Sequence, residues 1–199
     1  IKRRGVVLPP FLGYNARRKF YDAVMMGVVL PQQNGKWERI MAKAFPFAEY
    51  FDTPAVKGRT FAQFRKLLAA LGIGERDFRT IHVAGTNGKG STCAYLESIL
   101  LEGGLEVGCF TSPALRYPNE RFRFDGERID DETLARFANK TAEAEKALSA
   151  SFGGFDRMYA TALLYFQARD AAWTIVETGI GGRPDPTNAT PAETRAPTS

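Results

Sequence analysis

The chain is poor in the residues that build metal centres, with one histidine and two cysteines among 199 residues. Cys93 and Cys109 lack the spacing of paired metal ligands, and we interpret them as small core residues of a protein from a reducing compartment. We interpret the single histidine, His82, as a structural residue of a strand. This composition therefore gives no indication of a metal site built from cysteine or histidine.

Long apolar runs are also absent. A helix that crosses a bilayer needs about 20 apolar residues, and the best candidate, residues 23–30, is far too short. A basic start at residues 2–4 resembles the beginning of a signal peptide, but Pro9 and Pro10 stop the apolar run that follows. We therefore expect a cytoplasmic protein without a membrane partner.

Charge of either sign is not concentrated in the sequence. The 27 lysines and arginines exceed the 22 aspartates and glutamates by five, and they are dispersed. This balance suits anionic small molecules as partners and does not indicate nucleic acid, and an ordinary solvated surface is the favoured interpretation.

The chain does contain the pattern of one α/β domain. Its length and its 44% hydrophobic content are enough for one full α/β domain with a core. Apolar spacing predicts elements in β-α-β order, which is typical of a parallel sheet flanked by helices. The predicted helices span residues 56–71, 90–101, 130–150 and 155–169; strands are predicted from residue 81, at 105–111 and at 172–177, with a hairpin at 121–129.

Two segments flank the predicted domain, which spans residues 57–190. Residues 1–56 are expected to form a mainly helical N-terminal extension, with amphipathic helices at 15–29 and 37–47 to which we assign no chemistry. Residues 191–199 are rich in proline, threonine and alanine and show no strand pattern. We expect this tail to be disordered.

A glycine-rich turn lies between the first predicted strand and its helix. Glycines let successive backbone N–H groups point into one concavity, and the start of a helix adds its positive dipole end. Lys89 supplies a full charge, and Ser91 or Thr92 supplies a hydroxyl group for a phosphate or for Mg²⁺. The turn predicts a cradle for a nucleotide triphosphate, although a glycine-rich turn without a ligand remains the alternative. The candidate residues are Gly85, Thr86, Asn87, Gly88, Lys89, Gly90, Ser91 and Thr92.

The next two predicted strands end in polar residues. In an open α/β sheet, ligands collect at the carboxyl ends of the strands. Ser112 follows the second strand and is a candidate Mg²⁺ ligand, although a Ser-Pro pair is also common in plain turns. Glu177 closes the apolar third strand, and a buried carboxylate is costly unless a metal ion or a basic group faces it. Both residues are therefore candidates for a metal site.

Three motifs in order resemble the folylpolyglutamate synthase and dihydrofolate synthase family, within the wider group of Mur ligases. The first is His-Val-Ala-Gly-Thr-Asn-Gly-Lys-Gly-Ser at residues 82–91. The second combines Ser-Pro-Ala-Leu at 112–115 with Asn-Glu-Arg at 119–121. The third is Glu-Thr-Gly-Ile-Gly-Gly-Arg-Pro-Asp-Pro-Thr-Asn at 177–188. The resemblance covers about residues 57–190.

The chain departs from these patterns at several positions. The general phosphate-loop pattern fails, because Val83 and Gly90 occupy places where it asks for glycine and for serine or threonine. Relative to the family, Ala114 replaces a histidine, and two prolines replace leucine and alanine around Asp185. In the helix predicted from residue 155, Asp156 and Tyr159 replace glutamate and threonine.

The resemblance implies an α/β, P-loop-type ATPase domain of Mur-ligase type, here incomplete. In such enzymes ATP and Mg²⁺ phosphorylate a carboxylate of folate or dihydropteroate, and the amine of glutamate then attacks the acyl phosphate. Carried over, Lys89 neutralises charge during transfer, Ser112 and Glu177 ligate Mg²⁺, and Asp185 and Arg121 bind the substrate. The family also implies a monomer.

Two classes of function remain open from the sequence. One is a ligase of the folate-glutamate type, represented by its ATP-binding domain; the other is a nucleotide- or pterin-binding module that does not complete amide synthesis. A different P-loop kinase or a peptidoglycan Mur ligase fits the second and third motifs less well. For Arg121 and Arg123 in the predicted hairpin, contact with an acidic substrate and exposure to water are both open, and water is the favoured interpretation. The family continues after the third motif into another strand, metal-binding residues and a second domain, for which we find no pattern here.

Overall fold

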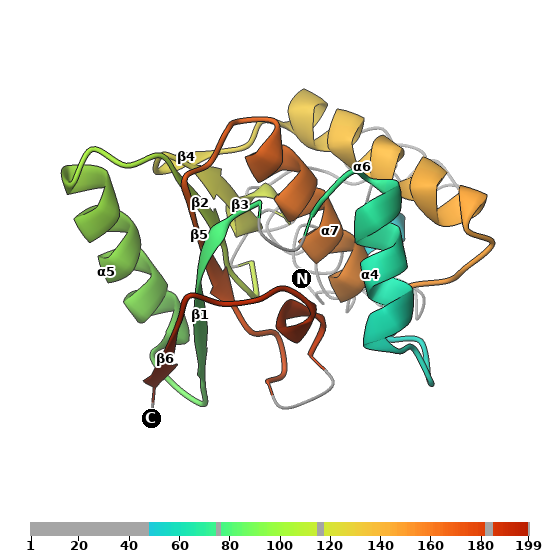
Figure 1. Ribbon diagram of the computed structural model, residues 1–199, viewed down its shortest axis with the longest axis horizontal. Coiled ribbons are helices and arrows are strands. Elements are labelled where there is room, and N and C mark those ends of the chain that lie inside the picture. The colour runs from blue at the N-terminus through green and yellow to red at the C-terminus, as the bar shows by residue number, and fades with distance from the viewer. Residues whose placement is uncertain (1–47, 75–76, 115–117, 182–184, 199) are drawn as a thin grey trace, which may run out of the picture.

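The structure is a computed structural model, and it describes residues 48–74, 77–114, 118–181 and 185–198. In this part of the chain one sheet has the strand order β4-β3-β2-β5-β1-β6. The strands β2, β5, β1 and β6 run parallel, whereas β3 pairs antiparallel with β2 and β4 pairs antiparallel with β3. Helices cover both faces of the sheet (Figure 1). The predicted α/β class with a parallel sheet is therefore confirmed.

The strands are β1 Arg79–Gly85, β2 Val107–Phe110, β3 Phe122–Phe124, β4 Glu127–Arg128, β5 Trp173–Glu177 and β6 Thr194–Thr198. The α-helices are α3 Ala48–Phe51, α4 Phe61–Ala70, α5 Lys89–Glu102, α6 Asp131–Ala147 and α7 Gly154–Gln167, and the 3₁₀ helices are η1 Pro118–Arg121 and η2 Pro186–Ala189. The helices predicted at 15–29 and 37–47 lie outside the described residues.

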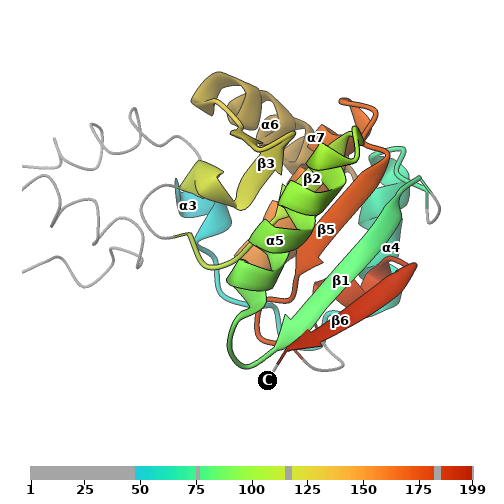
Figure 2. The ribbon, with the colours of Figure 1, turned by 90° about the vertical axis from the view of Figure 1, so that its left-hand side faces the viewer.

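The two faces of the sheet have separate cores. Helix α5 covers one face, and α4, α6 and α7 lie on the other (Figures 1 and 2). Successive side chains of β5 belong to opposite faces of the sheet: Ile175 packs in the cluster under α5, and Val176 packs in the larger cluster under α7. Eleven of the fourteen residues of α7 are buried, which explains why its sequence is apolar on most sides.

Most predicted boundaries shift by one to three residues, but α4 starts five residues later than predicted. The cause is a capping box, in which the Thr60 hydroxyl accepts from the Gln63 backbone N–H and the Gln63 side chain accepts from the Thr60 N–H. Residues 50–56, assigned to the N-terminal extension, precede this cap and pack on α7. The backbone oxygen of Thr53, for example, accepts from the Gly154 N–H at 2.9 Å.

The predicted hairpin is confirmed. Asp125 and Gly126 join β3 to β4 with φ values of 51° and 78°, and the type I′ turn requires positive values at both positions. Phe122 and Phe124 point into the core. The hairpin thereby fixes η1, which directly precedes β3, at the edge of the parallel strands.

The prediction of a disordered tail is wrong for residues 194–198. These residues form β6, which pairs in parallel with β1 from Ile81 opposite Thr194 to Gly85 opposite Thr198 (Figure 2). The residues of β6 are exposed or half-buried. The strand therefore lacks the alternation of apolar and polar residues by which a half-buried strand is predicted from sequence. Proline is tolerated at Pro197 because an edge strand needs ladder hydrogen bonds on one side only.

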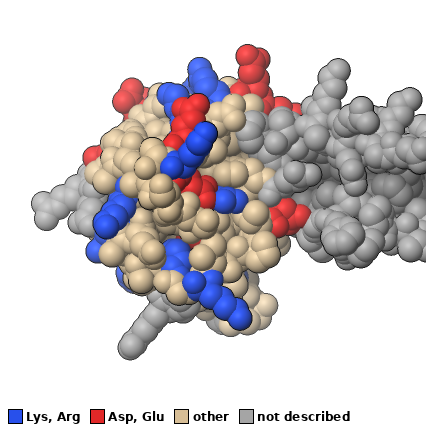
Figure 3. Space-filling model, turned by 90° about the vertical axis from the view of Figure 1, so that its right-hand side faces the viewer, with Lys and Arg blue, Asp and Glu red and all other residues tan. Residues whose placement is uncertain are grey.

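The surface agrees with the dispersed charge of the sequence. On the face shown in Figure 3, lysine and arginine side chains are interspersed with aspartate and glutamate. Among the described helices, none has both the length and the apolar character that a membrane crossing needs.

Candidate functional site

The glycine-rich turn leads from the carboxyl end of β1 directly into α5. Gly88 is the N-cap of α5 and has φ 76° and ψ 0°, a left-handed conformation that glycine adopts without strain. Gly85 to Gly88 are exposed, and α5 begins at Lys89. The first N–H groups of α5 and its positive dipole end therefore lie at the turn, which is the arrangement that binds phosphate groups.

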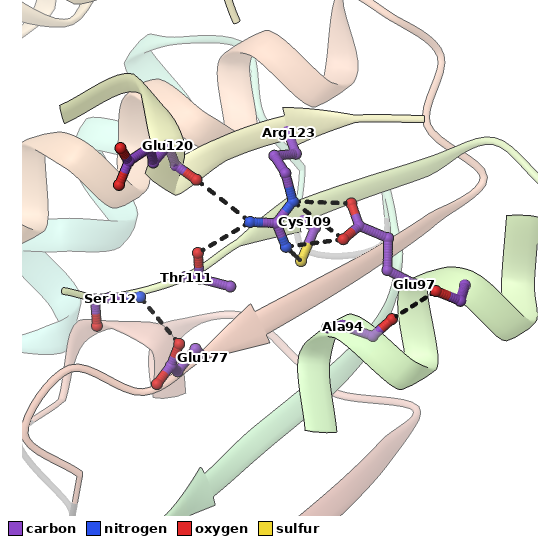
Figure 4. Close-up of polar contacts among 9 residues, drawn as sticks. Ala94, Glu97, Cys109, Thr111, Ser112, Glu120, Arg123 and Glu177 are labelled. Atoms are coloured by element: carbon purple, nitrogen blue, oxygen red, sulfur yellow. Dashed lines mark hydrogen bonds and ion pairs between the residues drawn. The ribbon is translucent and has the colours of Figure 1, made fainter. Parts of the chain in front are cut away.

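Lys89 lies between the turn and the end of β5. Its Nζ donates to the Thr86 backbone oxygen at 3.5 Å and lies 4.0 Å from Glu177 Oε1. The other carboxylate oxygen of Glu177 accepts a hydrogen bond from the Ser112 N–H at 3.0 Å (Figure 4). The structure thus brings together four of the predicted site residues, Thr86, Lys89, Ser112 and Glu177, which come from three different parts of the chain.

Glu177 is a buried carboxylate whose nearest cation, Lys89, lies at 4.0 Å. It is 4% exposed, and burial raises its pKa, while the Ser112 N–H, Lys89, Arg121 and Arg123 oppose the rise. The Cβ that an alanine would place at Gly90 would lie 4.0 Å from Glu177 Oε2, so the start of α5 passes close to this carboxylate. A buried carboxylate with a raised pKa is suited to receive a cation.

The donor set fits a magnesium ion better than a zinc ion. Among the described residues, no group of three or more histidine, cysteine, aspartate and glutamate side chains is arranged so that it could hold a metal ion. Mg²⁺ usually takes one or two carboxylates and completes its octahedron with water and substrate phosphates. Glu177 and the adjacent Ser112 supply one carboxylate and one hydroxyl group beside the phosphate turn. The residues therefore fit Mg²⁺ accompanied by a nucleotide.

Arg123 joins the elements around Ser112. Its guanidinium donates to both carboxylate oxygens of Glu97 on α5 at 2.8–3.2 Å, and to Thr111 Oγ1 at 3.4 Å (Figure 4). It also donates to the Glu120 backbone oxygen at 3.4 Å and to Cys109 Sγ at 3.2 Å. The expectation that this arginine faces water is wrong, because its guanidinium forms an ion pair with Glu97, which lies 26 residues away in the sequence.

Arg121 is also buried, with 8% of its surface exposed. Its Nε has no hydrogen-bond partner among the residues that the structure describes, and burial lowers the pKa of Arg121 against the opposing effect of Glu177 and Glu120. A guanidinium nitrogen without a partner is costly inside a protein. The expectation of a water-facing side chain is wrong here too, and Arg121 instead lines a cavity.

The cavity has a volume of about 590 Å³, within the range typical of small-molecule sites. It contains three predicted residues, Ser112, Arg121 and Asp185. The sequence analysis does not single out the other lining residues, which come from residues 53–59, from the start of α7 and from motif positions that carry no charged or hydroxyl side chain. The further lining residues are Thr53, Ala55, Val56, Gly58, Arg59, Pro113, Gly153, Phe155, Asp156, Gly179, Ile180, Gly181 and Pro186.

Asp185 organises one wall of this cavity. Its Oδ2 accepts from the N–H groups of Gly179, Ile180 and Gly181 at 2.8–3.2 Å. Its Oδ1 accepts from both the N–H and the hydroxyl group of Thr187, at 3.1 and 2.6 Å. The structure thus places Asp185 at the cavity with five donors already on its carboxylate, and its predicted contact with a substrate stays a prediction.

Known proteins resemble this chain in sequence over about two thirds of its length. No model of a known protein family matches the chain. The dihydrofolate synthase/folylpolyglutamate synthase of Bacillus subtilis is 43% identical over 131 residues, which are 63% of this chain and 30% of that protein. The folylpolyglutamate synthase of Lacticaseibacillus casei is 39% identical over 127 residues, or 61% of this chain and 30% of that protein.

Solved structures resemble it in fold as well. Escherichia coli FolC in complex with DHPP and ADP superposes with a TM-score of 0.70 at 30% identity, over 79% of this chain and 37% of that one. The bifunctional folylpolyglutamate synthase/dihydrofolate synthase from Yersinia pestis, complexed with AMPPNP and a Mn ion, gives 0.67 at 28% identity, over 76% and 37%. The chain spans about a third of the length of these relatives. By sequence and by fold, it is a partial homologue of the dihydrofolate synthases and folylpolyglutamate synthases.

Proposed function

We propose that this chain forms the ATP-binding part of a ligase that adds glutamate to folate or dihydropteroate through an acyl phosphate. The observation that carries the proposal is the position of Glu177. Its buried carboxylate lies between Lys89 of the phosphate turn and Ser112, which also lines the cavity. A nucleotide site and a substrate site would therefore meet at one point, as phosphoryl transfer to a substrate carboxylate requires.

ATP and Mg²⁺ are the proposed ligands of the turn. The structures of relatives in complex with ADP, or with AMPPNP and a Mn ion, support this assignment. Residues Gly85–Thr92 would hold the phosphates through backbone N–H groups and the Lys89 ammonium, and Ser112 and Glu177 would hold the metal. The bound metal would supply charge neutralisation for the phosphates. Lys89 would stabilise the charge that develops on the transferred phosphoryl group.

The cavity is the proposed site of the folate or dihydropteroate. The complexes of relatives with DHPP and with folate support this substrate class. Arg121 brings a buried Nε that lacks a partner, and a substrate carboxylate or its phosphorylated form would satisfy it. Arg121 is thus a proposed substrate ligand, while Asp185 shapes the wall beside it.

A binding module without turnover is the alternative function. It stays open because the chain matches only part of the length of its relatives. The chain spans 30% of the Bacillus subtilis relative, so residues outside this span contribute to that protein. Measurement of ADP release with and without glutamate separates the two functions. Robust glutamate-dependent release from the purified chain would exclude a module without turnover.

Calorimetric titration tests the nucleotide site. We expect Mg²⁺-ATP to bind the purified chain and the Lys89→Ala variant to lose this binding, while Lys66→Ala, which removes an exposed lysine from α4, keeps it. Absence of binding to the unchanged chain would contradict the proposed nucleotide site. A parallel titration with folate should be weakened by Arg121→Met but not by Arg128→Met, which changes an exposed hairpin arginine.

A further inference from the structure

A line of hydrogen bonds runs from the edge of the sheet to the cavity wall. It begins at Arg195 on β6, passes through His82 on β1 and Thr187 in η2, and ends on Asp185. His82 is 2% exposed and Thr187 is 1% exposed. Buried polar groups of this kind keep their positions, because each partner lost leaves another group unsatisfied.

The chemistry of the groups fixes the direction of each bond. Asp185 Oδ1 accepts the single hydroxyl hydrogen of Thr187 across 2.6 Å. The Thr187 oxygen is then the acceptor toward His82 Nε2 at 2.7 Å, so Nε2 carries the hydrogen. His82 Nδ1 lies 3.1 Å from Arg195 Nη1 and must accept, because a guanidinium only donates. His82 is therefore held as the neutral Nε2–H tautomer.

The line ends at the residues that form the cavity wall. Asp185 Oδ2 holds the N–H groups of Gly179 and Gly181, while its Oδ1 is held by Thr187. Oδ1 accepts both the N–H and the hydroxyl group of Thr187, so rotation of the hydroxyl group would remove one of its two donors. The Nε2–H of His82 opposes that rotation because it donates to the hydroxyl oxygen. The orientation of one imidazole ring is thereby connected to the shape of the cavity.

We propose that His82 is a positioning residue for the substrate cavity, acting through Thr187 and Asp185 on the wall formed by residues 179–181. The proposal rests on the proposed function, in that the cavity is taken to bind a ligand of the folate class. His82 itself does not line the cavity. It acts from the neighbouring strand, with Arg195 of β6 setting its tautomer.

Four variants separate positioning from general stability. His82→Phe keeps an aromatic ring but removes both hydrogen bonds, whereas His82→Gln retains an N–H donor near the position of Nε2. Thr187→Val breaks the line without changing β1. Thr80→Val is the matched control, because it removes a buried hydroxyl contact on the same strand, to Thr174 at 2.9 Å, that has no link to the cavity.

The first readout is the affinity for folate, measured by calorimetry at neutral pH. We expect His82→Phe and Thr187→Val to weaken binding about tenfold, as misplaced supporting groups do, with His82→Gln restoring most of it and Thr80→Val leaving it unchanged. Folate affinity that is unchanged in both His82→Phe and Thr187→Val would overturn the proposal while leaving the proposed function intact. Equal losses in His82→Phe and Thr80→Val would overturn it too, since destabilisation alone would then explain the effect.

The second readout does not need a ligand. His82 is the only histidine in the chain, so its two imidazole nitrogens can be assigned in a ¹⁵N NMR spectrum without ambiguity. We expect a protonated Nε2 and an unprotonated Nδ1, and shifts of the Gly179 and Gly181 amide resonances in Thr187→Val but not in Thr80→Val. The opposite tautomer would overturn the proposal. If the unchanged chain failed to bind folate, the proposed function would fall, and these amide shifts would still decide whether His82 positions the wall.

Discussion

The Glu177 carboxylate accepts the backbone N–H of Ser112 at 3.0 Å, and this contact joins the carboxyl ends of β5 and β2. Lys89 approaches the same carboxylate from α5, at 4.0 Å. One acidic side chain therefore connects two strands and the phosphate turn. Burial raises the pKa of Glu177, which means that the ionised carboxylate is destabilised by the loss of water around it. A bound cation would offset this destabilisation.

Replacement of Glu177 by glutamine should separate metal binding from stability. The amide keeps an acceptor for Ser112 but removes the buried charge, so we expect the free energy of unfolding to change by less than about 1 kcal/mol. Binding of Mn²⁺ in the presence of AMPPNP should weaken by about tenfold or more, since the carboxylate ligand is lost. Glu97→Gln is the control, because it changes a buried glutamate that pairs with Arg123. Equal Mn²⁺ affinity in Glu177→Gln and the unchanged chain would contradict the metal assignment.

The ion pair between Arg157 and Glu145 should be a major stabilising contact between α7 and α6. Arg157 Nη2 lies 2.7 Å from Glu145 Oε1, and the same guanidinium donates to Thr53 Oγ1 at 2.8 Å. Arg157→Met would leave the Glu145 carboxylate buried without its cation, which costs about 3 kcal/mol. Urea unfolding monitored by circular dichroism measures this loss. The double variant Glu145→Gln/Arg157→Met should recover part of it, and a double variant less stable than Arg157→Met would speak against the explanation.

Stability should fall in mildly acidic solution because of His82. Burial and Arg195 lower its pKa, although Asp185 opposes them. In the unfolded chain the imidazole takes up its proton near pH 6.5, whereas the folded protein resists protonation until a lower pH. The unfolded state then binds more protons, so the free energy of unfolding decreases as the pH falls below about 6.5, and levels off below the folded-state pKa.

The difference between the unchanged chain and His82→Gln isolates this contribution, because the other titrating groups are common to both. We expect the stability advantage of histidine over glutamine to be smaller at pH 5.5 than at pH 7.5, as measured by the urea midpoint. The same advantage at both pH values would show that the His82 pKa is not lowered by folding.

The two cysteines should react slowly with thiol reagents in the folded protein. Cys93 and Cys109 are both fully buried. The pKa of Cys109 is raised well above its usual value, mainly by a hydrogen bond with Cys93 and secondly by burial. The reactive thiolate is therefore scarce. Reaction with a chromogenic disulfide reagent at pH 7.5 should be at least about tenfold slower in buffer than in guanidinium chloride. Equal rates would mean that α5 and β2 separate readily.

The sequence predicts the centre of this fold better than its edge. The glycine turn and the strands on either side carry their own chemistry, and the structure brings Lys89, Ser112 and Glu177 together as the β-α-β order requires. Strand β6 was missed because its residues are exposed or half-buried and its strand character comes from pairing with β1, which no local pattern contains.

The candidate site was predictable only where a motif names the residue. The alternation of Arg121, Phe122, Arg123 and Phe124 correctly placed the phenylalanines in the core, but it suggested water for both arginines. Their partners come from distant positions: Glu97 lies on another element, and the cavity beside Arg121 is completed by residues 53–59. Asp185 was recognised as important from its motif, whereas its five donors depend on a loop conformation that a sequence does not specify.

The connection from β5 to β6 passes over β1, because β1 lies between these two strands in the sheet. The wall of the cavity is part of this connection, and it is therefore fastened at both ends to the sheet. Hydrogen exchange should reflect this arrangement. The amides of Gly179 and Gly181, although they belong to a loop, would exchange together with the β1–β6 ladder as one cooperative unit and not as a fraying surface segment. A ligand that closed on this wall would then slow exchange at the far edge of the sheet as well.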